Sequence, residues 1–211
     1  MRVKVALLDD TQAGFLCLLP IEIASAGPLG RDLSVIQCLT VRRSMHGQGA
    51  GRALIAAAEQ EALCQGRRGI VVTAFYHDFW FMPASYFEML GYEPVRRKNR
   101  TALLWKAFEG AAEAPEFMEP KYRFEPAEGK AVVDLFWTQS CLTSDTEAQR
   151  VREVVAEFGD AVLLREHCSD EPDVRARYGI SRAIFVQGRE VGWGHEAPKD
   201  GLRQAIQRTL H

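Results

Sequence analysis

The sequence predicts an α/β protein with mixed sheets, divided into two domains. One observation is a strand pattern, a glycine-dense loop and a helix pattern in succession between residues 33 and 63. Another is the order strand, helix, strand, helix, strand, strand, helix between residues 131 and 210. Between them lies a segment rich in Ala, Glu and Pro. Alternating strand and helix patterns are typical of α/β folds. We therefore expect domains at residues 1–108 and 131–211, joined by a semi-extended linker at 109–130.

The composition is that of a globular protein. The chain has 211 residues, 47% of them hydrophobic, and no apolar run long enough to cross a bilayer. The net charge is −2, with a mildly basic first half and an acidic second half. This distribution suits a polyanionic cofactor in the first half. It argues against nucleic acid as a partner, and we expect no membrane association.

The cysteines indicate a reducing compartment. There are five, and they are widely spaced along the chain. An odd, scattered set does not suggest a disulfide framework or a zinc site, so no metal is expected. The first residues lead directly into an alternating strand pattern rather than a secretory signal. A cytoplasmic location is the simplest expectation.

Three strands are predicted ahead of the glycine-dense loop. Arg2–Leu8 and Gly14–Ile23 have strand patterns and are joined by a polar turn, and Leu33–Val41 is apolar and β-branched. A loop containing Gly and Pro at residues 26–30 separates the second strand from the third.

The loop after the third strand has glycine at alternating positions, Gly47, Gly49 and Gly51. Glycine permits unusual dihedrals and a close approach of backbone N–H groups to a ligand. A helix pattern follows at once, so these groups would lie at its positive end, where phosphate is stabilised. Arg52 and Ala53 stand where a Walker loop needs Lys and Ser or Thr, and the dinucleotide fingerprint fails on glycine spacing. The loop is predicted to bind another phosphate ligand, the alternative being a flexible turn.

This segment resembles the acetyl-CoA signature of the GCN5-related N-acetyltransferase (GNAT) family. The family pattern is Gln or Arg, two residues, Gly, any residue, then Gly or Ala, and residues 46–51 fit it with His46 in the first place. A second motif, residues 83–92, is similar to the family's helix that ends in Leu-Gly-Phe/Tyr. Residues 93–108 then predict two strands with a turn at 98–100. The resemblance covers residues 1–108 and implies a GNAT fold with acetyl-CoA as the cofactor.

The resemblance also implies which residues bind the cofactor. The backbone of Leu39 and Val41 would pair with the pantetheine arm like an added strand. Guanidinium groups would bond phosphate oxygens, although Arg42 and Arg43 are equally compatible with a solvated rim. His46 would donate to the pyrophosphate as a weaker anchor than Gln or Arg. The expected cofactor-binding set is Leu39, Val41, Arg42, His46, Gly47, Gln48, Gly49, Ala50, Gly51 and Arg52.

The catalytic residues follow the family pattern less closely. Acyl transfer to an amine needs a base and an acid. In many members the acid is a Tyr four residues before the Gly of the Leu-Gly-Phe/Tyr motif, and that position is Phe87 here. The neighbouring Tyr86 is the candidate acid, but one helical residue is a turn of about 100°, so a packing role is the alternative. Glu22, Asp32 and His77 are candidate bases that are also compatible with surface roles.

The first domain departs from the family at its beginning. A strand and two helices normally precede these strands and help to form the acceptor site. The GNAT fold is therefore expected to be truncated, with the second domain covering or completing that site. Residues 77–82 are unusually aromatic for a loop and are expected either to line the acceptor or pantetheine channel or to belong to the core.

The second domain is similar to a thioredoxin fold. Its expected strands are 131–136, 161–164, 183–187 and 190–193, with a hairpin turn at 188–189, and its expected helices are 143–158, 171–178 and 201–210. Residues 137–141, Trp-Thr-Gln-Ser-Cys, lie where that family has Trp-Cys-x-x-Cys. The combination of the two halves resembles the YoaP-type acetyltransferases.

The thioredoxin-like half is degenerate. Thr138 replaces the first cysteine, and no proline lies between Pro172 and Pro198, so a dithiol cycle is not expected. Cys141, just before a helix, is a candidate reactive thiolate. The alternative is a small buried residue.

Together these features predict transfer of an acetyl group from acetyl-CoA to a small-molecule or peptide amine. The candidate catalytic residues are Tyr86 and Cys141. Two alternatives stay open: a non-catalytic CoA-binding or partner-binding module, and a thiol-based redox or metal-handling protein that uses Cys141. A homodimer is also left open.

Overall fold

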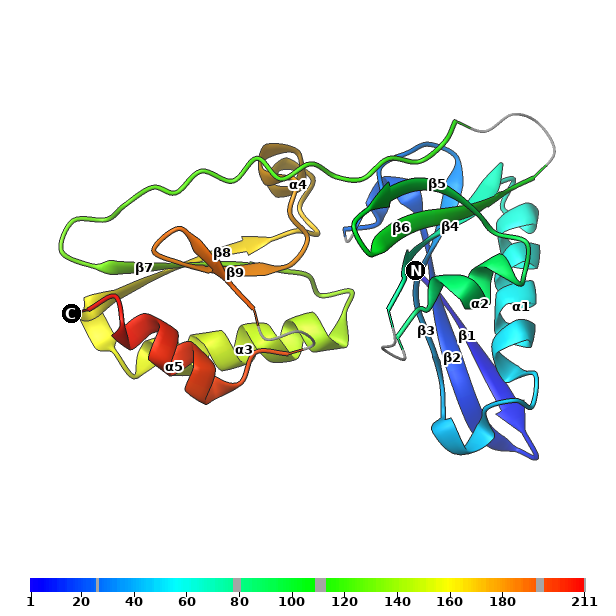
Figure 1. Ribbon diagram of the computed structural model, residues 1–211, viewed down its shortest axis with the longest axis horizontal. Coiled ribbons are helices and arrows are strands. Elements are labelled where there is room, and N and C mark those ends of the chain that lie inside the picture. The colour runs from blue at the N-terminus through cyan, green and yellow to red at the C-terminus, as the bar shows by residue number, and fades with distance from the viewer. Residues whose placement is uncertain (26, 78–80, 109–112, 193–195, 211) are drawn as a thin grey trace. The chain divides into compact units, whose positions relative to one another are not determined.

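The computed structural model describes residues 1–25, 27–77, 81–108, 113–192 and 196–210, and the chain forms two compact units (Figure 1). Unit 1 is Met1–Met118 and unit 2 is Glu119–His211. The boundary lies inside the segment expected to be a linker. Residues 78–80 of the aromatic loop, 109–112 of the linker and Trp193 at the end of the last predicted strand lie outside the described residues.

Unit 1 contains a six-stranded mixed sheet of order β1-β2-β3-β4-β6-β5. β3 and β4 are parallel and the other neighbours are antiparallel. Parallel strands need a crossover connection, and helix α1 (Ala50–Cys64) provides it; the short helix α2 (Ala84–Glu88) follows β4. The strands are β1 (Arg2–Leu8), β2 (Thr11–Pro20), β3 (Leu33–Val41), β4 (Gly69–Phe75), β5 (Glu93–Lys98) and β6 (Thr101–Ala107).

The predicted elements of unit 1 are confirmed, with differences at their ends. The second strand was expected to reach Ile23, but β2 stops at Pro20 and Ile21–Ile23 forms a 3-10 turn. Proline has no N–H to donate to the ladder, which accounts for the early stop. α2 is shorter than the motif at residues 83–92: it ends at Glu88, and turns lead on to Gly91, which has a positive φ of 83°.

The main core of unit 1 lies between the sheet and α1. Leu54, Ile55 and Ala58 are buried on one face of the helix. They pack with Leu16 and Ile36 of the sheet. Burying each large aliphatic side chain contributes about 1.5–3 kcal/mol, so this face holds α1 against the sheet.

Unit 2 contains a four-stranded mixed sheet of order β10-β9-β7-β8. β7 and β8 are parallel, and β9 is antiparallel to both β7 and β10. Figure 1 shows α3 and α5 on one side of this sheet and α4 on the other. The elements are β7 (Ala131–Trp137), α3 (Leu142–Ala156), β8 (Val162–Cys168), α4 (Pro172–Tyr178), β9 (Ala183–Val186), β10 (Arg189–Val191) and α5 (Lys199–Gln207).

Two predictions for unit 2 need correction. The strand expected at 161–164 extends as β8 to Cys168, because Arg165–Cys168 pair with the end of β7. The hairpin turn is Gln187-Gly188 rather than 188–189, since Val186 pairs with Arg189. Both turn residues have positive φ, 49° and 76°, as a two-residue hairpin turn of the primed type requires.

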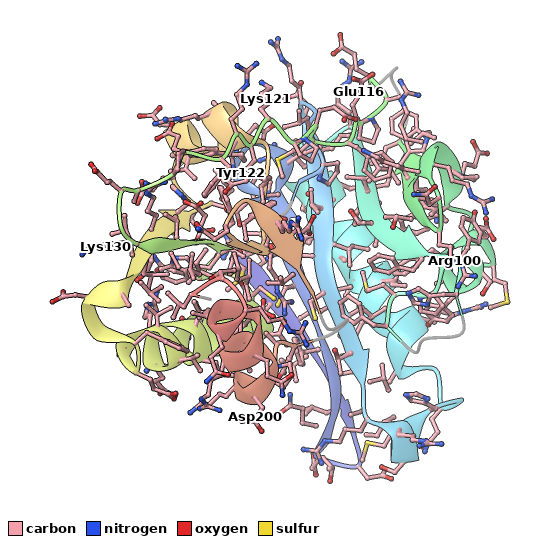
Figure 2. All side chains as sticks on the ribbon, turned by 60° about the vertical axis from the view of Figure 1, so that its left-hand side comes forward. Arg100, Glu116, Lys121, Tyr122, Lys130 and Asp200 are labelled. Carbon is pink, nitrogen blue, oxygen red and sulfur yellow. The ribbon has the colours of Figure 1, made fainter. Side chains whose placement is uncertain are left out.

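The expected linker is attached to both units. Glu116 pairs with Leu29 of unit 1. From Lys121, whose N–H donates to Tyr178 O at 2.7 Å, the chain runs over the sheet of unit 2 to Lys130, the residue before β7 (Figure 2). On the way Tyr122 stacks on Phe185 with ring centroids 4.0 Å apart. The described part of the segment, residues 113–130, is thus packed structure rather than a bare spacer.

None of the helices in the described part of the chain has the length and apolar character needed to span a membrane.

Candidate functional site

β3 and β4 pair over only part of their length. The ladder runs from Leu33 opposite Gly69 to Ile36 opposite Val72. On their other sides, β3 remains paired with β2 as far as Val41, and β4 remains paired with β6 as far as Phe75. The two strands, both fully described, therefore share no ladder beyond Ile36 and Val72.

A β-bulge at Gln37 accounts for this separation. Cys38 pairs with Cys17, yet Ile36 pairs with Leu18, so Gln37 is an extra residue in β3. A bulge bends its strand and increases the local twist. Burial changes at the same point, from buried at residues 33–36 to half-buried at residues 37–41. The edge of β3 that faces β4 is open there to pair with an extended ligand. Sequence analysis did not predict the bulge.

The glycine loop leads into α1 without a side-chain cap. Gly47 and Gly49 have φ of 77° and 85°, and Gly49 is the N-cap residue. The first helical bond runs from Ala53 N to Gly49 O at 3.0 Å. The N–H groups of residues 50–52 consequently have no acceptor within the helix. Uncapped donors at the positive end of a helix fit a phosphate group.

A cavity of about 460 Å³ lies against this loop, a size typical of small-molecule sites. It brings together eight residues of the predicted cofactor set: Leu39, Val41, His46, Gly47, Gly49, Ala50, Gly51 and Arg52. Arg42 and Gln48 are exposed and do not line it. An apolar wall is formed by Met45, Met82, Pro83, Met89 and Leu90. Met82 belongs to the loop at residues 77–82, which was expected to line a channel or to join the core, and it does both. The other four residues of the wall were not predicted.

His46 bridges the loop and the end of β3. Its Nε2 lies 3.0 Å from the carbonyl oxygen of Val41. A carbonyl only accepts, so Nε2 carries the hydrogen in this bond and Nδ1 of the neutral ring is an acceptor. The predicted donation from His46 to a pyrophosphate therefore requires the charged ring. In its neutral form His46 holds the loop against the strand.

Tyr86 and Phe87 point in different directions from α2. Phe87 is fully buried and meets Tyr92 edge to face, with ring centroids 5.6 Å apart. Tyr86 lines the cavity, and its hydroxyl lies 2.5 Å from where a Cβ on Gly51 would be. Glycine at position 51 thus leaves room for this phenol.

The phenol of Tyr86 keeps its proton near neutral pH. Burial raises the pKa of Tyr86 above its ordinary value, and the nearby Arg52 cation acts in the opposite direction without cancelling it. Tyr86 is therefore a hydrogen-bond donor beside the first turn of α1.

Helix α2 is held against the sheet by polar contacts. Tyr76, just after β4, donates its hydroxyl hydrogen to the carboxylate of Glu88. The guanidinium of Arg97 lies 4.3 Å from the centre of the Tyr76 ring. Lys106 of β6 contacts the Glu59 carboxylate of α1 at 3.1 Å and donates to Leu90 O, just after α2, at 3.4 Å. These contacts keep the wall that carries Tyr86 in place.

The candidate bases lie elsewhere in unit 1. Glu22 forms an ion pair with Arg67 at 3.0 Å and accepts a hydrogen bond from Asp32 N at 2.9 Å. His77 stacks on Phe75, with ring centroids 5.2 Å apart. Among the described residues that line the cavity, none of these three is found.

Cys141 belongs to unit 2 and is the N-cap residue of α3. Its sulfur lies 3.1 Å from the hydroxyl of Thr143, which accepts a bond from Arg182 at 3.1 Å. Thr138, at the position of the first thioredoxin cysteine, is buried and donates to Asp170 Oδ1 at 2.7 Å. This loop is closed by its own hydrogen bonds.

Comparison with protein families gives one match. Residues 2–79 match the model described as the acetyltransferase (GNAT) family. The matched segment lies in unit 1 and includes the glycine loop. The mixed sheet of unit 1 is consistent with the GNAT fold. No sequence among the curated proteins matches the chain.

Solved structures of acetyltransferases are among those similar to this chain. PaiA N-acetyltransferase from Thermoplasma acidophilum in complex with coenzyme A is 14% identical, with a TM-score of 0.41 over 50% of this chain and 60% of that one. A putative GNAT-family acetyltransferase from Desulfovibrio desulfuricans is 18% identical, with a TM-score of 0.42 over 50% of this chain and 68% of that one. The chain thus spans less than two thirds of the Thermoplasma structure.

Proposed function

We propose that this chain is a coenzyme A-dependent N-acyltransferase of the GNAT type, which transfers an acetyl group from acetyl-CoA to a small-molecule or peptide amine. One observation carries the proposal. The uncapped first turn of α1 and the open edge of β3 border the same cavity. The first suits a diphosphate and the second suits the amide groups of a pantetheine arm. The family match over residues 2–79 supports it.

Different residues of unit 1 would bind different parts of the cofactor. The N–H groups of residues 50–52 would hold the diphosphate, and the guanidinium of Arg52 would add a charged contact. The backbone of Leu39 and Val41 would align the pantetheine arm and so position the reacting carbonyl. Acetyl-CoA, when bound, supplies the acyl group as an activated thioester.

Tyr86 is better suited to binding than to proton transfer. Its hydroxyl lies beside Gly51, at the end of the cavity where a phosphate would be held. We therefore propose that it donates a hydrogen bond to a phosphate oxygen. The role of acid predicted for Tyr86 has a distinct signature, a lower kcat with an altered pH profile rather than a higher KM.

Calorimetry followed by a turnover assay tests the proposal. The full chain is titrated with acetyl-CoA and then assayed over a panel of amines, with release of the coenzyme A thiol as the readout. Binding together with turnover is the expected result. A chain that does not bind acetyl-CoA overturns the proposal.

One observation favours a second candidate, a non-catalytic CoA-binding or partner-binding module. Phe87 occupies the position of the family acid and is fully buried. Binding of acetyl-CoA without turnover of any amine would support this candidate.

We further propose that unit 2 is a degenerate thioredoxin-like domain, in an arrangement like that of the YoaP-type acetyltransferases. We also propose that the chain works in the cytoplasm. Whether it forms a homodimer is a question for measurement of its mass in solution. The strand order β10-β9-β7-β8 and the helices on both sides of the sheet support the fold. Thr138 stands in place of the first thioredoxin cysteine and its hydroxyl donates to Asp170, which weighs against thiol-based chemistry in this loop. A thiol function of Cys141 predicts that Cys141→Ser abolishes a measurable thiol reactivity.

A further inference from the structure

Two cysteines of unit 1 lie directly opposite each other on neighbouring strands. Cys17 of β2 and Cys38 of β3 are partners in the antiparallel register, next to the bulge at Gln37. Partners in a ladder place their side chains on the same face of the sheet. Both residues are thiols in the structure, and both are half-buried.

The spacing of such a pair permits a disulfide. Opposite residues in an antiparallel ladder have Cα atoms about 4.5–5.5 Å apart. Disulfides form between residues whose Cα atoms are about 4.4–6.8 Å apart. The first range lies within the second, so the spacing of β2 and β3 is compatible with a bond between the two sulfur atoms.

The pair lies on the face of the sheet opposite α1. Leu16 and Leu18, on either side of Cys17, are buried in the core beneath α1, so Cys17 points the other way. On that face Cys17 is the ladder partner of Val3, which is 51% exposed. Cys38 Sγ lies 3.7 Å from the hydroxyl of Thr40. A small oxidant in solution can therefore reach the pair.

We propose that Cys17 and Cys38 form a redox-responsive dithiol, which a peroxide oxidises to a cross-strand disulfide. One sulfur, as thiolate, attacks a peroxide oxygen and becomes a sulfenic acid, while the other oxygen leaves as water or an alcohol. The second thiol then attacks the sulfenic sulfur, the S–S bond forms and water leaves. Two thiols lose two electrons in total, and one peroxide is reduced.

Peptide mapping of the full chain after treatment with hydrogen peroxide tests the proposal. Remaining thiols are alkylated and the protein is cleaved after Lys and Arg. Cleavage after Arg31 separates residues 5–31, which contain Cys17, from residues 32–42, which contain Cys38. These two peptides are expected to stay joined, with a mass lower by two hydrogens, and to separate on reduction. The linked species should come from monomeric protein on a non-reducing gel.

Two variants provide controls. Cys38→Ser should abolish the linked pair, whereas Cys64→Ser, which removes an exposed thiol at the end of α1, should leave it unchanged. The proposal is overturned if Cys17 and Cys38 remain alkylated separately, oxidise singly, or link to other cysteines or between chains. Mapping of the wild-type chain alone decides this if a variant fails to fold. The outcome does not depend on whether the chain binds coenzyme A.

Discussion

The two units of this chain contain the same local arrangement with opposite outcomes. In each, a strand leads through a short loop into a helix of 15 residues, which connects two parallel strands. In unit 1 the loop before α1 ends in glycines and borders a cavity. In unit 2 the loop before α3 is occupied by its own side chains. The N–H of Gln139 donates to Asp170 Oδ2 at 2.7 Å, and that of Thr138 donates to Ser144 Oγ at 3.0 Å.

Neither helix has a side-chain cap, so the difference lies in the loop that precedes each of them. Both helices have the same dipole, and backbone donors lie ahead of both. In unit 2 side-chain oxygens accept hydrogen bonds from the N–H groups of Thr138 and Gln139, which closes the loop ahead of α3. In unit 1 the loop ahead of α1 borders a cavity, where a bound diphosphate would provide acceptors for the first turn.

The largest expected effect comes from opening the loop of unit 2. Asp170→Ala leaves the Thr138 hydroxyl and the Gln139 N–H without their acceptor. Loss of bonds to a carboxylate should lower the free energy of unfolding of unit 2 by about 2–3 kcal/mol. Chemical denaturation measures this change. Asp160→Ala, at an exposed carboxylate of the same unit, is the control and should change it by less than about 0.5 kcal/mol.

A side chain introduced into the glycine loop of unit 1 should weaken the binding of coenzyme A. Gly49→Ala adds a methyl group to the cavity lining next to the first turn of α1, and we expect a loss of about tenfold or more, or about 1.4 kcal/mol. Gly66→Ala is a matched control, because Gly66 also has a positive φ, 69°, and open space around it, but lies beyond the end of α1. Both variants should lose similar stability from the left-handed conformation, about 1–2 kcal/mol. Equal affinities of the two variants for coenzyme A would contradict the proposal that the glycine loop and the first turn of α1 hold the diphosphate.

Removing a single donor from the cavity should have a smaller effect. Tyr86→Phe deletes the hydroxyl beside Gly51 and keeps the ring in the wall. We expect KM for acetyl-CoA to rise by about three- to tenfold with little change in kcat, because one neutral hydrogen bond contributes about 1 kcal/mol. Steady-state kinetics at several pH values measure both constants. A fall in kcat with an altered basic limb would instead assign Tyr86 to proton transfer.

The smallest effect concerns a second carboxylate that unit 2 uses as an internal acceptor. Burial raises the pKa of Asp134, but hydrogen bonds from His167 and Tyr122 outweigh it and hold the pKa below its ordinary value. A carboxyl group whose pKa is lowered by folding stabilises the fold at pH values above its pKa in the unfolded chain, about 3.9. This contribution is lost as the pH falls below that value and through the pKa of the folded state. The stability difference between wild type and Asp134→Asn should therefore shrink below about pH 4. Thermal unfolding between pH 7 and pH 3 measures it, and a constant difference would exclude this linkage.

Local patterns allowed much of the fold to be predicted from the sequence. The glycine loop could be located because strand and helix patterns meet there within a few residues. The bulge at Gln37 could not, since one extra residue hardly changes the pattern of an apolar strand.

The parts of the sites that depend on tertiary contacts were missed. Helical geometry correctly separated the directions of Tyr86 and Phe87, but the contact of Tyr86 with Gly51 depends on how α2 packs against α1. The same holds for Thr138 and Asp170, which lie 32 residues apart in the sequence and meet only because β7 and β8 are neighbours.

Calorimetry with two matched ligands tests the central claim most directly. Wild type and Gly49→Ala are each titrated with coenzyme A and with pantetheine, which lacks the diphosphate and the phosphorylated adenosine. If the first turn of α1 holds the diphosphate, wild type binds coenzyme A far more tightly than pantetheine, and the substitution weakens only coenzyme A. Wild-type protein that binds both ligands equally, or neither, would contradict the account.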